Sequence, residues 1–321
     1  MIINVKQKSI VNKKKKTNLH KELQRLWKQR ELQAMVIPGI IFLIIFSYIP
    51  MYGLVMAFQN YQIGDMVGFS HWVGFDNFTL FLKDPNFFLI LRNTLGISSL
   101  KLLVGFPIPI IFALLLNEAK GTFFKRSVQT ISYLPHFISW IAVYGIVFQF
   151  VSIDGGLLNS ILLHLHIINT EIAYLGKPNY FWSILVMSDL WKEVGWNAII
   201  YMAAISSIDQ EQYEAAEIDG CGRIQKMWNI TFPGIKPTIV ILLIFSVSGI
   251  LNAGFEQVLL MQNPMVSNVS EIIDTYVLKQ GLGQFRFSFA TAIGMFKSVI
   301  AIVLLFMANQ ISRKVSDSSL W

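Results

Sequence analysis

Long apolar segments alternate with shorter polar ones along most of this chain. A helix needs about 20 mainly apolar residues to cross the hydrocarbon core of a bilayer, and six segments reach that length. These segments are Met35–Phe58, Leu89–Leu116, Val128–Val151, Phe181–Ile205, Thr238–Met261 and Phe287–Ile311. The pattern therefore predicts an all-α, polytopic membrane protein with six transmembrane helices.

The composition supports the same class of protein. Asp, Glu, Lys and Arg make up 14% of the 321 residues, whereas soluble domains carry about 25%. With a mean hydropathy of +0.54, too few polar groups remain to cover a soluble fold of this size, which excludes a water-soluble enzyme and a disordered chain. Cys221 is the single cysteine, so an intramolecular disulfide and a cysteine-rich metal site are excluded as well.

The distribution of Lys and Arg predicts the orientation of the spans. With the N-terminus inside, 18 of the 26 Lys and Arg residues fall in inside segments and 4 fall in outside loops. Cytoplasmic segments of membrane proteins carry such an excess of positive charge. We therefore expect a multi-pass protein of the cytoplasmic (inner) membrane with both termini in the cytoplasm.

Residues 1–34 form a basic cytoplasmic region before the membrane domain, which is expected to comprise residues 35–321. The cluster Lys13–Lys16 is typical of juxtamembrane segments that bind anionic membrane lipid, and this explanation is favoured over a nucleic-acid-binding arm. A helix lying in the cytoplasmic interface is predicted by apolar residues that share one face. These residues are Leu19, Leu23, Leu26 and Trp27.

Sequence motifs for enzymatic chemistry are missing from the chain. It has no G-x-x-x-x-G-K-[ST] phosphate loop, no H-E-x-x-H and no C-x-x-C. The five histidines are scattered, and His164 and His166 diverge on a helix without a third ligand nearby. We expect no catalytic residue, no metal site and no cofactor bound by this chain.

The polar segment 206–237, between the fourth and fifth spans, has the pattern of two short helices on the cytoplasmic side. Asp209 stands where an N-cap is expected, and Gly220 stands just past the end of the first helix. The second helical piece, Arg223–Ile230, is expected to end before Phe232-Pro233, because proline disfavours helical geometry in the residue before it.

The residues EAAEIDGCGRIQKMWNITFPGIKP at Glu214–Pro237 resemble the EAA loop of permease subunits of ABC importers. That loop combines Glu-Ala-Ala, a following Asp-Gly, an Ile-Thr-Leu-Pro run and a further proline. The matching positions are Glu214, Ala215, Ala216, Asp219, Gly220, Ile230, Thr231, Pro233 and Pro237, with Phe232 in place of the usual leucine.

Further strings extend the resemblance over nearly the whole chain. They are YIPMYG at Tyr48–Gly53, SYLPHFISW at Ser132–Trp140, NAGFEQVL at Asn252–Leu259 and the terminal SLW at Ser319–Trp321. The chain is similar to binding-protein-dependent carbohydrate permeases of the LplB type, which are related to the membrane subunits of the maltose importer. The resemblance implies the type I ABC importer permease fold and ATP-driven oligosaccharide import by alternating access.

The same resemblance implies the partners of the chain and a role for its loop. The expected partners are a second homologous permease subunit, two ABC ATPase subunits that bind ATP and Mg, and an extracytoplasmic solute-binding protein. ATP hydrolysis would belong to the ATPase subunits, and the loop would couple it to the membrane. The residues expected to carry this coupling are Tyr213, Glu214, Ala215, Ala216, Asp219, Gly220, Met227 and Pro233. The alanines and Gly220 would let the loop seat closely in a cleft, and Tyr213 and Met227 would supply buried contact area.

Polar and aromatic residues within the spans predict a substrate path. Amides, carboxylates and flat aromatic rings are groups that bind sugars, and Asn252 and Glu256, four residues apart, would share one face of the fifth span. The expected path residues are Trp196, Asn197, Tyr201, Asn252, Phe255 and Glu256. Packing against the partner permease is the alternative for each of them. In the fourth span, Asp189 and Lys192 are three residues apart and are expected to pair.

Two other functions compete with a permease subunit. A secondary transporter driven by an ion gradient could use Asp189 and Glu256 as ion sites, but the two halves of the chain show no convincing repeat of the kind common in such carriers. A scaffold subunit without its own substrate contacts is the other alternative.

Overall fold

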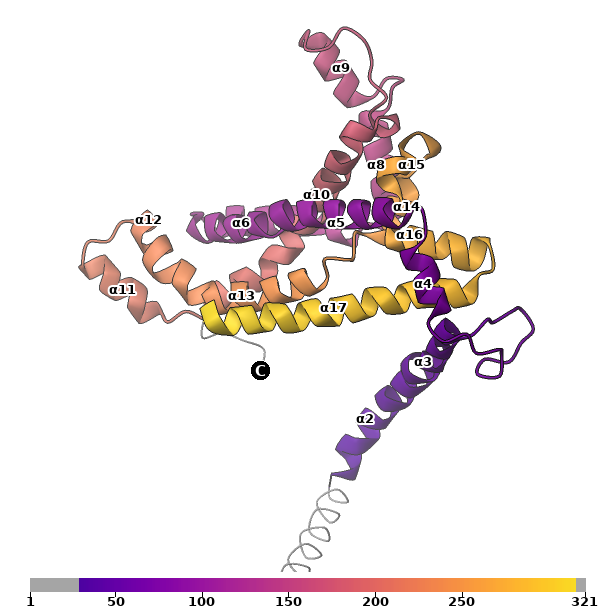
Figure 1. Cartoon of the computed structure of the whole chain (residues 1–321). Coiled ribbons are helices and arrows are strands. Elements are labelled where there is room, and N and C mark those ends of the chain that lie inside the picture. Colours follow the sequence, from indigo (N-terminus) through magenta and orange to yellow (C-terminus); the bar gives the residue numbers. More distant parts are fainter. Residues whose placement is uncertain (1–28, 316–321) are drawn as a thin grey trace, which may run out of the picture. The chain divides into compact units, whose positions relative to one another are not determined.

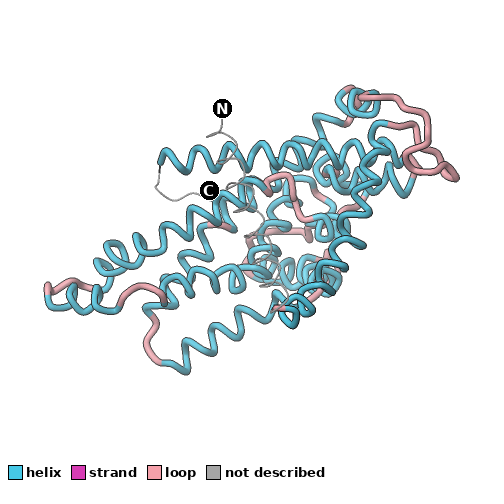
Figure 2. The backbone as a smooth tube through the Cα atoms, turned by 90° about the horizontal axis from the view of Figure 1, so that it is seen from below, coloured by secondary structure: helices cyan, strands magenta, loops and turns pink. Residues whose placement is uncertain are grey.

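The structure, a computed structural model, describes residues 29–315. Helices joined by loops make up this part of the chain (Figure 2), and its extended pairing is limited to a single bridge between Gln59 and Trp72. The all-α prediction is confirmed for these residues. The predicted interfacial helix and the terminal Ser319–Trp321 lie outside the described residues.

The chain divides into two compact units, of which the first comprises the described residues up to Val55 together with Met66–Phe69. Its helical part is α2 (Arg30–Leu43), the π-helical turn η1 (Ile44–Tyr48), α3 (Ile49–Met51) and the start of η2 (Tyr52–Phe58). None of the side chains of α2 is buried. Because its apolar residues are exposed on every side, this helix has the surface of a membrane span.

The second unit, Met56–Asp65 and Ser70 onward, contains the remaining helices. The α-helices are α4 (Asp76–Leu82), α5 (Phe87–Gly105), α6 (Pro107–Glu118), α7 (Thr122–Tyr133), α8 (Trp140–Val151), α9 (Leu157–His164), α10 (Pro178–Ser206), α11 (Gln210–Ile218), α12 (Arg223–Lys226), α13 (Phe232–Ser248), α14 (Phe255–Met261), α15 (Ser267–Ser270), α16 (Ile273–Leu278) and α17 (Phe287–Val315). The 3₁₀ and π-helical turns are η3 (Leu134–Phe137), η4 (Tyr174–Gly176), η5 (Met227–Thr231), η6 (Pro264–Val266) and η7 (Lys279–Gly283).

Within the second unit, α10 packs against α5, α6, α7 and α13, and α13 packs along α17. Figure 1 shows α11 and α12 at one end of this unit and α14 and α16 toward the other. The segment 206–237 is therefore at one end of this unit.

The helices long and apolar enough to cross a membrane match most of the predicted spans. Among the described residues they are Arg30–Phe58, Phe87–Glu118, Arg223–Ser248 and Phe287–Arg313. Helix α10 covers the predicted fourth span with 29 residues, but Asp189, Lys192 and Glu193 place three charges in its middle. These charges need partners inside the protein, which the site below supplies.

The third predicted span, Val128–Val151, is wrong as a single helix. The chain bends by 104° between Thr122–Phe137 and Trp140–Val151. Pro135 lies at this bend in η3, where its missing N–H removes a helical hydrogen bond. Ser139 then starts α8 as an N-cap, because its Oγ accepts a hydrogen bond from the N–H of Ala142 at 3.4 Å.

The fifth predicted span, Thr238–Met261, is wrong at both ends. One helix runs from Arg223 to Ser248, so Arg223–Ile230 is not a separate piece that ends before Phe232. The π-helical turn η5 ends at Thr231, two residues before Pro233, and its wider geometry lies where the proline ring would clash with an ordinary α-helical turn. The helix ends at Ser248, and the chain is irregular through Gly249–Gly254 before α14 begins.

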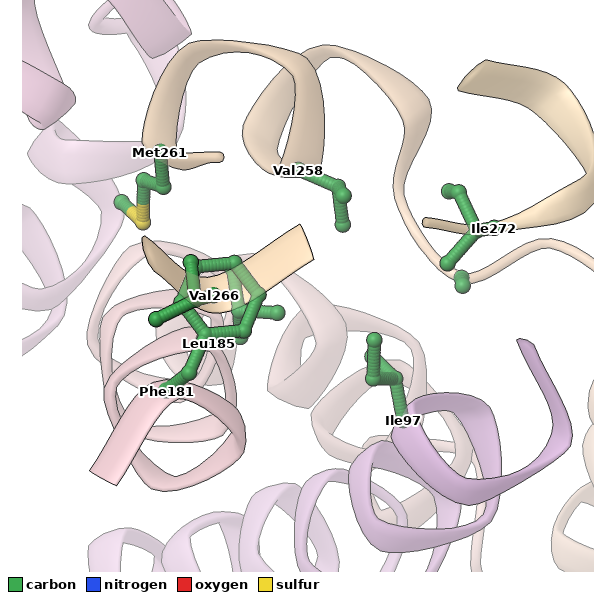
Figure 3. Packing of buried hydrophobic residues seen from close by; sticks show 8 residues of the cluster. Ile97, Phe181, Leu185, Val258, Met261, Val266 and Ile272 are labelled. Carbon is green, nitrogen blue, oxygen red and sulfur yellow. The ribbon is translucent and has the colours of Figure 1, made fainter. Parts of the chain in front are cut away.

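A cluster of buried apolar residues joins α5 and α10 to the segment after the break (Figure 3). Its labelled members are Ile97, Phe181, Leu185, Val258, Met261, Val266 and Ile272. Two further clusters lie around Phe81 and Phe289 and around Tyr201 and Ile235. The segment 249–272, which contains the irregular residues Gly249–Gly254 and the short helices after them, is thus packed onto the long helices.

Gly195 of α10 generates a prediction about this packing. A Cβ atom there would lie 2.2 Å from the carbonyl oxygen of Ser132 in α7, and a backbone atom cannot move aside alone. We predict that Gly195→Ala lowers the thermal midpoint of the purified protein, since overpacking costs about 1–3 kcal/mol. Gly145→Ala in α8 is the control, because its Cβ would meet nothing within 4 Å. Equal midpoints for the two variants would contradict this close packing.

Candidate functional site

Helix α11 of the segment 206–237 is capped at both ends. Asp209 Oδ1 accepts a hydrogen bond from the N–H of Glu211 at 3.0 Å. Gly220 has a φ of +77°, and the N–H of Cys221 donates to the carbonyl of Ala216 at 2.9 Å. This is the pattern of a glycine-ended helix. The predicted N-cap and the predicted C-terminal glycine are confirmed.

Helix α11 is attached to the start of the fifth span by side chains. The hydroxyls of Tyr213 and Thr231 are 2.9 Å apart, and Thr231 is buried. Lys226 Nζ lies 3.2 Å from Glu217 Oε1, and Met227 packs on the core cluster that contains Tyr201 and Ile235. We call the unit 206–237 the elbow, because these contacts join α11, η5 and the base of α13 into one body.

The elbow exposes five of the eight residues expected to carry the coupling, together with large apolar residues that the sequence analysis did not anticipate. Tyr213 and Met227 pack inside the elbow, and Ala216 is buried. The predicted residues that are exposed are Glu214, Ala215, Asp219, Gly220 and Pro233. The large apolar side chains exposed there are Ile218 at 88%, Ile224 at 71% and Trp228 at 57%. Their presence in a polar segment was a signal that the sequence analysis missed.

The attachment of α11 to η5 yields a prediction about the rigidity of the elbow. Thr231→Val keeps the side-chain volume but leaves Tyr213 without its partner, a loss of about 1 kcal/mol. We expect trypsin to cleave at Arg223 and Lys226 several-fold faster in this variant. The control is Thr130→Val, which removes a hydroxyl that bonds the Arg126 carbonyl of its own helix. Equal cleavage rates at the elbow would show that this hydrogen bond does not hold α11.

A cavity of about 340 Å³, lined by both polar and apolar groups, lies among α5, α6, α10, α13 and the irregular segment after α13. We call it the central cavity. Its lining consists of Ser98, Lys101, Leu102, Gly105, Phe106, Pro109, Asp189, Asn197, Ile200, Tyr201, Leu242, Ser246, Gly249, Ile250, Asn252 and Gly254. Amide, hydroxyl and aromatic groups thus face the cavity together with one Lys and one Asp.

Three of the predicted path residues, Asn197, Tyr201 and Asn252, line the central cavity. Trp196 is not in its lining, because it faces away from its neighbour Asn197 on α10 and stacks on the ring of His136 at 4.2 Å. The structure therefore brings together half of the residues that the sequence analysis assigned to one path.

The predicted shared face of Asn252 and Glu256 is wrong. Asn252 lies in the irregular segment, whereas Glu256 lies in the first turn of α14, so no common helix joins them. Phe255 lines a second cavity, of about 530 Å³, together with Asp274 and Lys297. Glu256 lines neither of these two cavities.

The predicted pair of Asp189 and Lys192 is also wrong. Asp189 Oδ1 lies 2.9 Å from Lys101 Nζ of α5. Lys192 lies 3.6 Å from Glu193 and donates to the carbonyl oxygen of Pro135 at 3.3 Å. Lys101 thus pairs with a neighbouring helix, whereas Lys192 contacts both Glu193 of its own helix and the backbone at the bend. Lys101 is the lining residue whose role only the tertiary structure reveals.

Within residues 29–315, no group of three or more His, Cys, Asp or Glu side chains is arranged to hold a metal ion. The central cavity offers hydrogen-bonding groups and aromatic rings, and the elbow offers an exposed apolar surface.

Comparison with known protein families gives one match that covers most of the chain. Residues 105–317 match the family described as "Binding-protein-dependent transport system inner membrane component". The matched range contains the elbow and most of the lining of the central cavity.

Individual relatives cover nearly the full length. Protein LplB of Bacillus subtilis (strain 168) is 45% identical over 298 residues, 92% of each chain. The polygalacturonan/rhamnogalacturonan transport system permease protein YteP of the same organism is 41% identical, over 96% of this chain and 95% of its own. A crystal structure of a bacterial ABC transporter involved in the import of the acidic polysaccharide alginate contains a chain with a TM-score of 0.83 and 39% identity, covering 91% of this chain and 98% of that chain.

Proposed function

This chain belongs to the family of inner-membrane components of binding-protein-dependent transport systems, and on that premise we propose that it is the permease subunit of an ATP-driven importer of oligosaccharides that works by alternating access. It has the type I ABC importer permease fold. The observation that carries the proposal is the central cavity, where amide, hydroxyl and charged groups line a space between the long helices.

An oligosaccharide as solute is supported by the lining of the cavity and by the relatives. Asn197, Asn252 and Tyr201 offer amide and phenol groups that suit sugar hydroxyls. The relatives include permeases named for polygalacturonan/rhamnogalacturonan and for arabinooligosaccharides, and the alginate transporter was also solved with a periplasmic protein bound to an alginate pentasaccharide.

The proposed partners are a second homologous permease subunit, two ABC ATPase subunits that bind ATP and Mg, and an extracytoplasmic solute-binding protein. In the proposed orientation both termini and the elbow face the cytoplasm, in agreement with the excess of Lys and Arg on that side. The elbow would then lie where an ATPase subunit could reach it. The chain itself would supply a path rather than a catalytic site.

The elbow supports a coupling role through its rigidity and its exposed apolar residues. Ile218, Ile224 and Trp228 offer apolar area for docking on a partner, and Glu214 and Ala215 are exposed beside them in sequence. The helix from Arg223 to Ser248 is continuous, so a displacement of the elbow would be passed to the wall of the central cavity as rigid-body motion.

The transport function predicts that proteoliposomes holding the full complex and its binding protein take up oligosaccharide with ATP inside. Uptake should persist with a protonophore, because ATP rather than an ion gradient supplies the driving force. Uptake that needs the gradient and not ATP would establish a secondary transporter instead. Uptake that persists when this subunit alone is omitted would make it a scaffold.

Variants of the central cavity test the path in the same assay. Tyr201→Phe and Asn252→Ala should each lower the uptake rate about tenfold, because a hydrogen bond to the solute is lost. Glu256→Ala is the matched control, since Glu256 does not line the cavity. Normal rates in both cavity variants, with assembly verified, would remove Tyr201 and Asn252 from the path.

The coupling role predicts that Gly220→Ala lowers the amount of solute taken up per ATP hydrolysed, or the amount of ATPase that co-purifies, by several-fold. A left-handed backbone costs an L-residue about 1–2 kcal/mol, so the end of α11 would shift. Glu214→Ala should have a similar effect through the exposed face of α11.

Gly222→Ala is the control for the coupling prediction, because Gly222 has a φ of −71° and room for a Cβ atom. It should behave as the unmodified protein does. Unchanged uptake per ATP and unchanged co-purification in both Gly220→Ala and Glu214→Ala would contradict the coupling role.

A further inference from the structure

A buried polar network lies at the wall of the central cavity. Lys101 Nζ of α5 pairs with Asp189 Oδ1 of α10 at 2.9 Å and donates to Gln257 Oε1 of α14. Gln257 is fully buried, and its Nε2 donates to the carbonyl of Leu185 and to Ser188 Oγ, each at 2.8 Å. Two side chains thus connect three helices that are far apart in sequence.

The network is located at the irregular segment that interrupts the fifth span. Gly254, the last residue before α14, has a φ of +90°, and a Cβ atom there would lie 2.6 Å from Lys101 Nζ. Helix α14 has only seven residues, so its position depends on what it contacts rather than on its own stability. The ammonium of Lys101 and the amide of Gln257 provide polar contacts of this kind.

A second ion pair of similar burial lies outside the central cavity. Lys297 Nζ of α17 lies 2.6 Å from Asp274 Oδ1 of α16, and the two side chains are 18% and 25% exposed. The values for Lys101 and Asp189 are 12% and 27%. The two pairs are alike in length and burial, but only Lys101 and Asp189 line the central cavity.

We propose that Lys101, Asp189 and Gln257 are positioning residues that hold α14 and the segment Gly249–Gly254 against α5 and α10, and so keep the central cavity closed on that side. To open this side, α14 would have to withdraw Gln257 from its partners in α5 and α10. Withdrawal would leave the buried amide of Gln257 without its hydrogen bonds to the Leu185 carbonyl and to Ser188, which is unfavourable for each buried polar group, so the network opposes movement of α14 away from α5 and α10. This inference concerns the same cavity as the proposed function but does not depend on its solute.

The test measures how readily reagents reach the cavity. Ser246, which lines it, is replaced by cysteine in a Cys221→Ala background, and a hydrophilic maleimide is added to the complex in nanodiscs without ATP or solute. Gln257→Leu keeps the ion pair and the approximate volume but removes the hydrogen bonds of Gln257 to Lys101, Leu185 and Ser188. We expect this variant to raise the labelling rate of the chain about tenfold, because it removes a hydrogen bond to a charged group. The labelled chain is identified by its mass. Lys101→Met should have the same effect.

The matched control is Lys297→Met, which removes an ion pair of similar burial that does not line the central cavity. It should leave the labelling rate unchanged. An equal rise in this control would show general loosening and would overturn the proposal, as would unchanged labelling in Gln257→Leu. If Lys101→Met fails to assemble, Lys101→Met/Asp189→Leu removes both charges and should label as fast as Gln257→Leu. Because solute and ATP are absent, these results stand apart from the transport assay.

Discussion

The backbone polar groups that are exposed where helices break inside an apolar protein must find partners other than water. Lys192 donates to the carbonyl of Pro135 at the bend of the third span, and Trp182 Nε1 donates to the carbonyl of Val269 at 2.8 Å. Asn93 Nδ2 of α5 reaches the carbonyls of Asn268 and Glu271 at 3.2 and 3.0 Å. Side-chain donors on α5 and α10 therefore satisfy backbone carbonyls of the irregular segments and stabilise them. Most other features of the second unit follow from those segments.

The central cavity is a direct result of the break after α13. A helix that continued from Ser248 would fill this region with its own side chains and would place Asn252 and Glu256 on one face. Instead, Gly249, Asn252 and Gly254 line the cavity with irregular backbone, and α14 restarts at Phe255. Irregular backbone within a membrane domain is tolerated where it is buried in protein or lines a cavity. Both conditions are met here.

The elbow and the cavity are linked because they belong to one helix. The helix that starts at Arg223 in the elbow carries Leu242 and Ser246 into the cavity lining. The turn η5 keeps this helix intact past Pro233, and Tyr213 fixes α11 to the same turn through Thr231. The elbow and the wall of the central cavity are thus joined by hydrogen-bonded backbone rather than by loose loops, as the proposed coupling role requires.

The sequence by itself determined the features that depend on local pattern. Apolar length identified the class of protein and most of the spans, and capping chemistry identified Asp209 and Gly220, because these signals act over a few neighbouring residues. The partner of Asp189, the end of the fifth span at Ser248 and the stacking of Trp196 on His136 were decided only by the tertiary structure. Lys101 lies 88 residues from Asp189, and Gln257 lies 72 residues from Leu185. A charge in an apolar span must be paired, but which distant residue pairs with it depends on how the helices pack, and no local pattern contains that information.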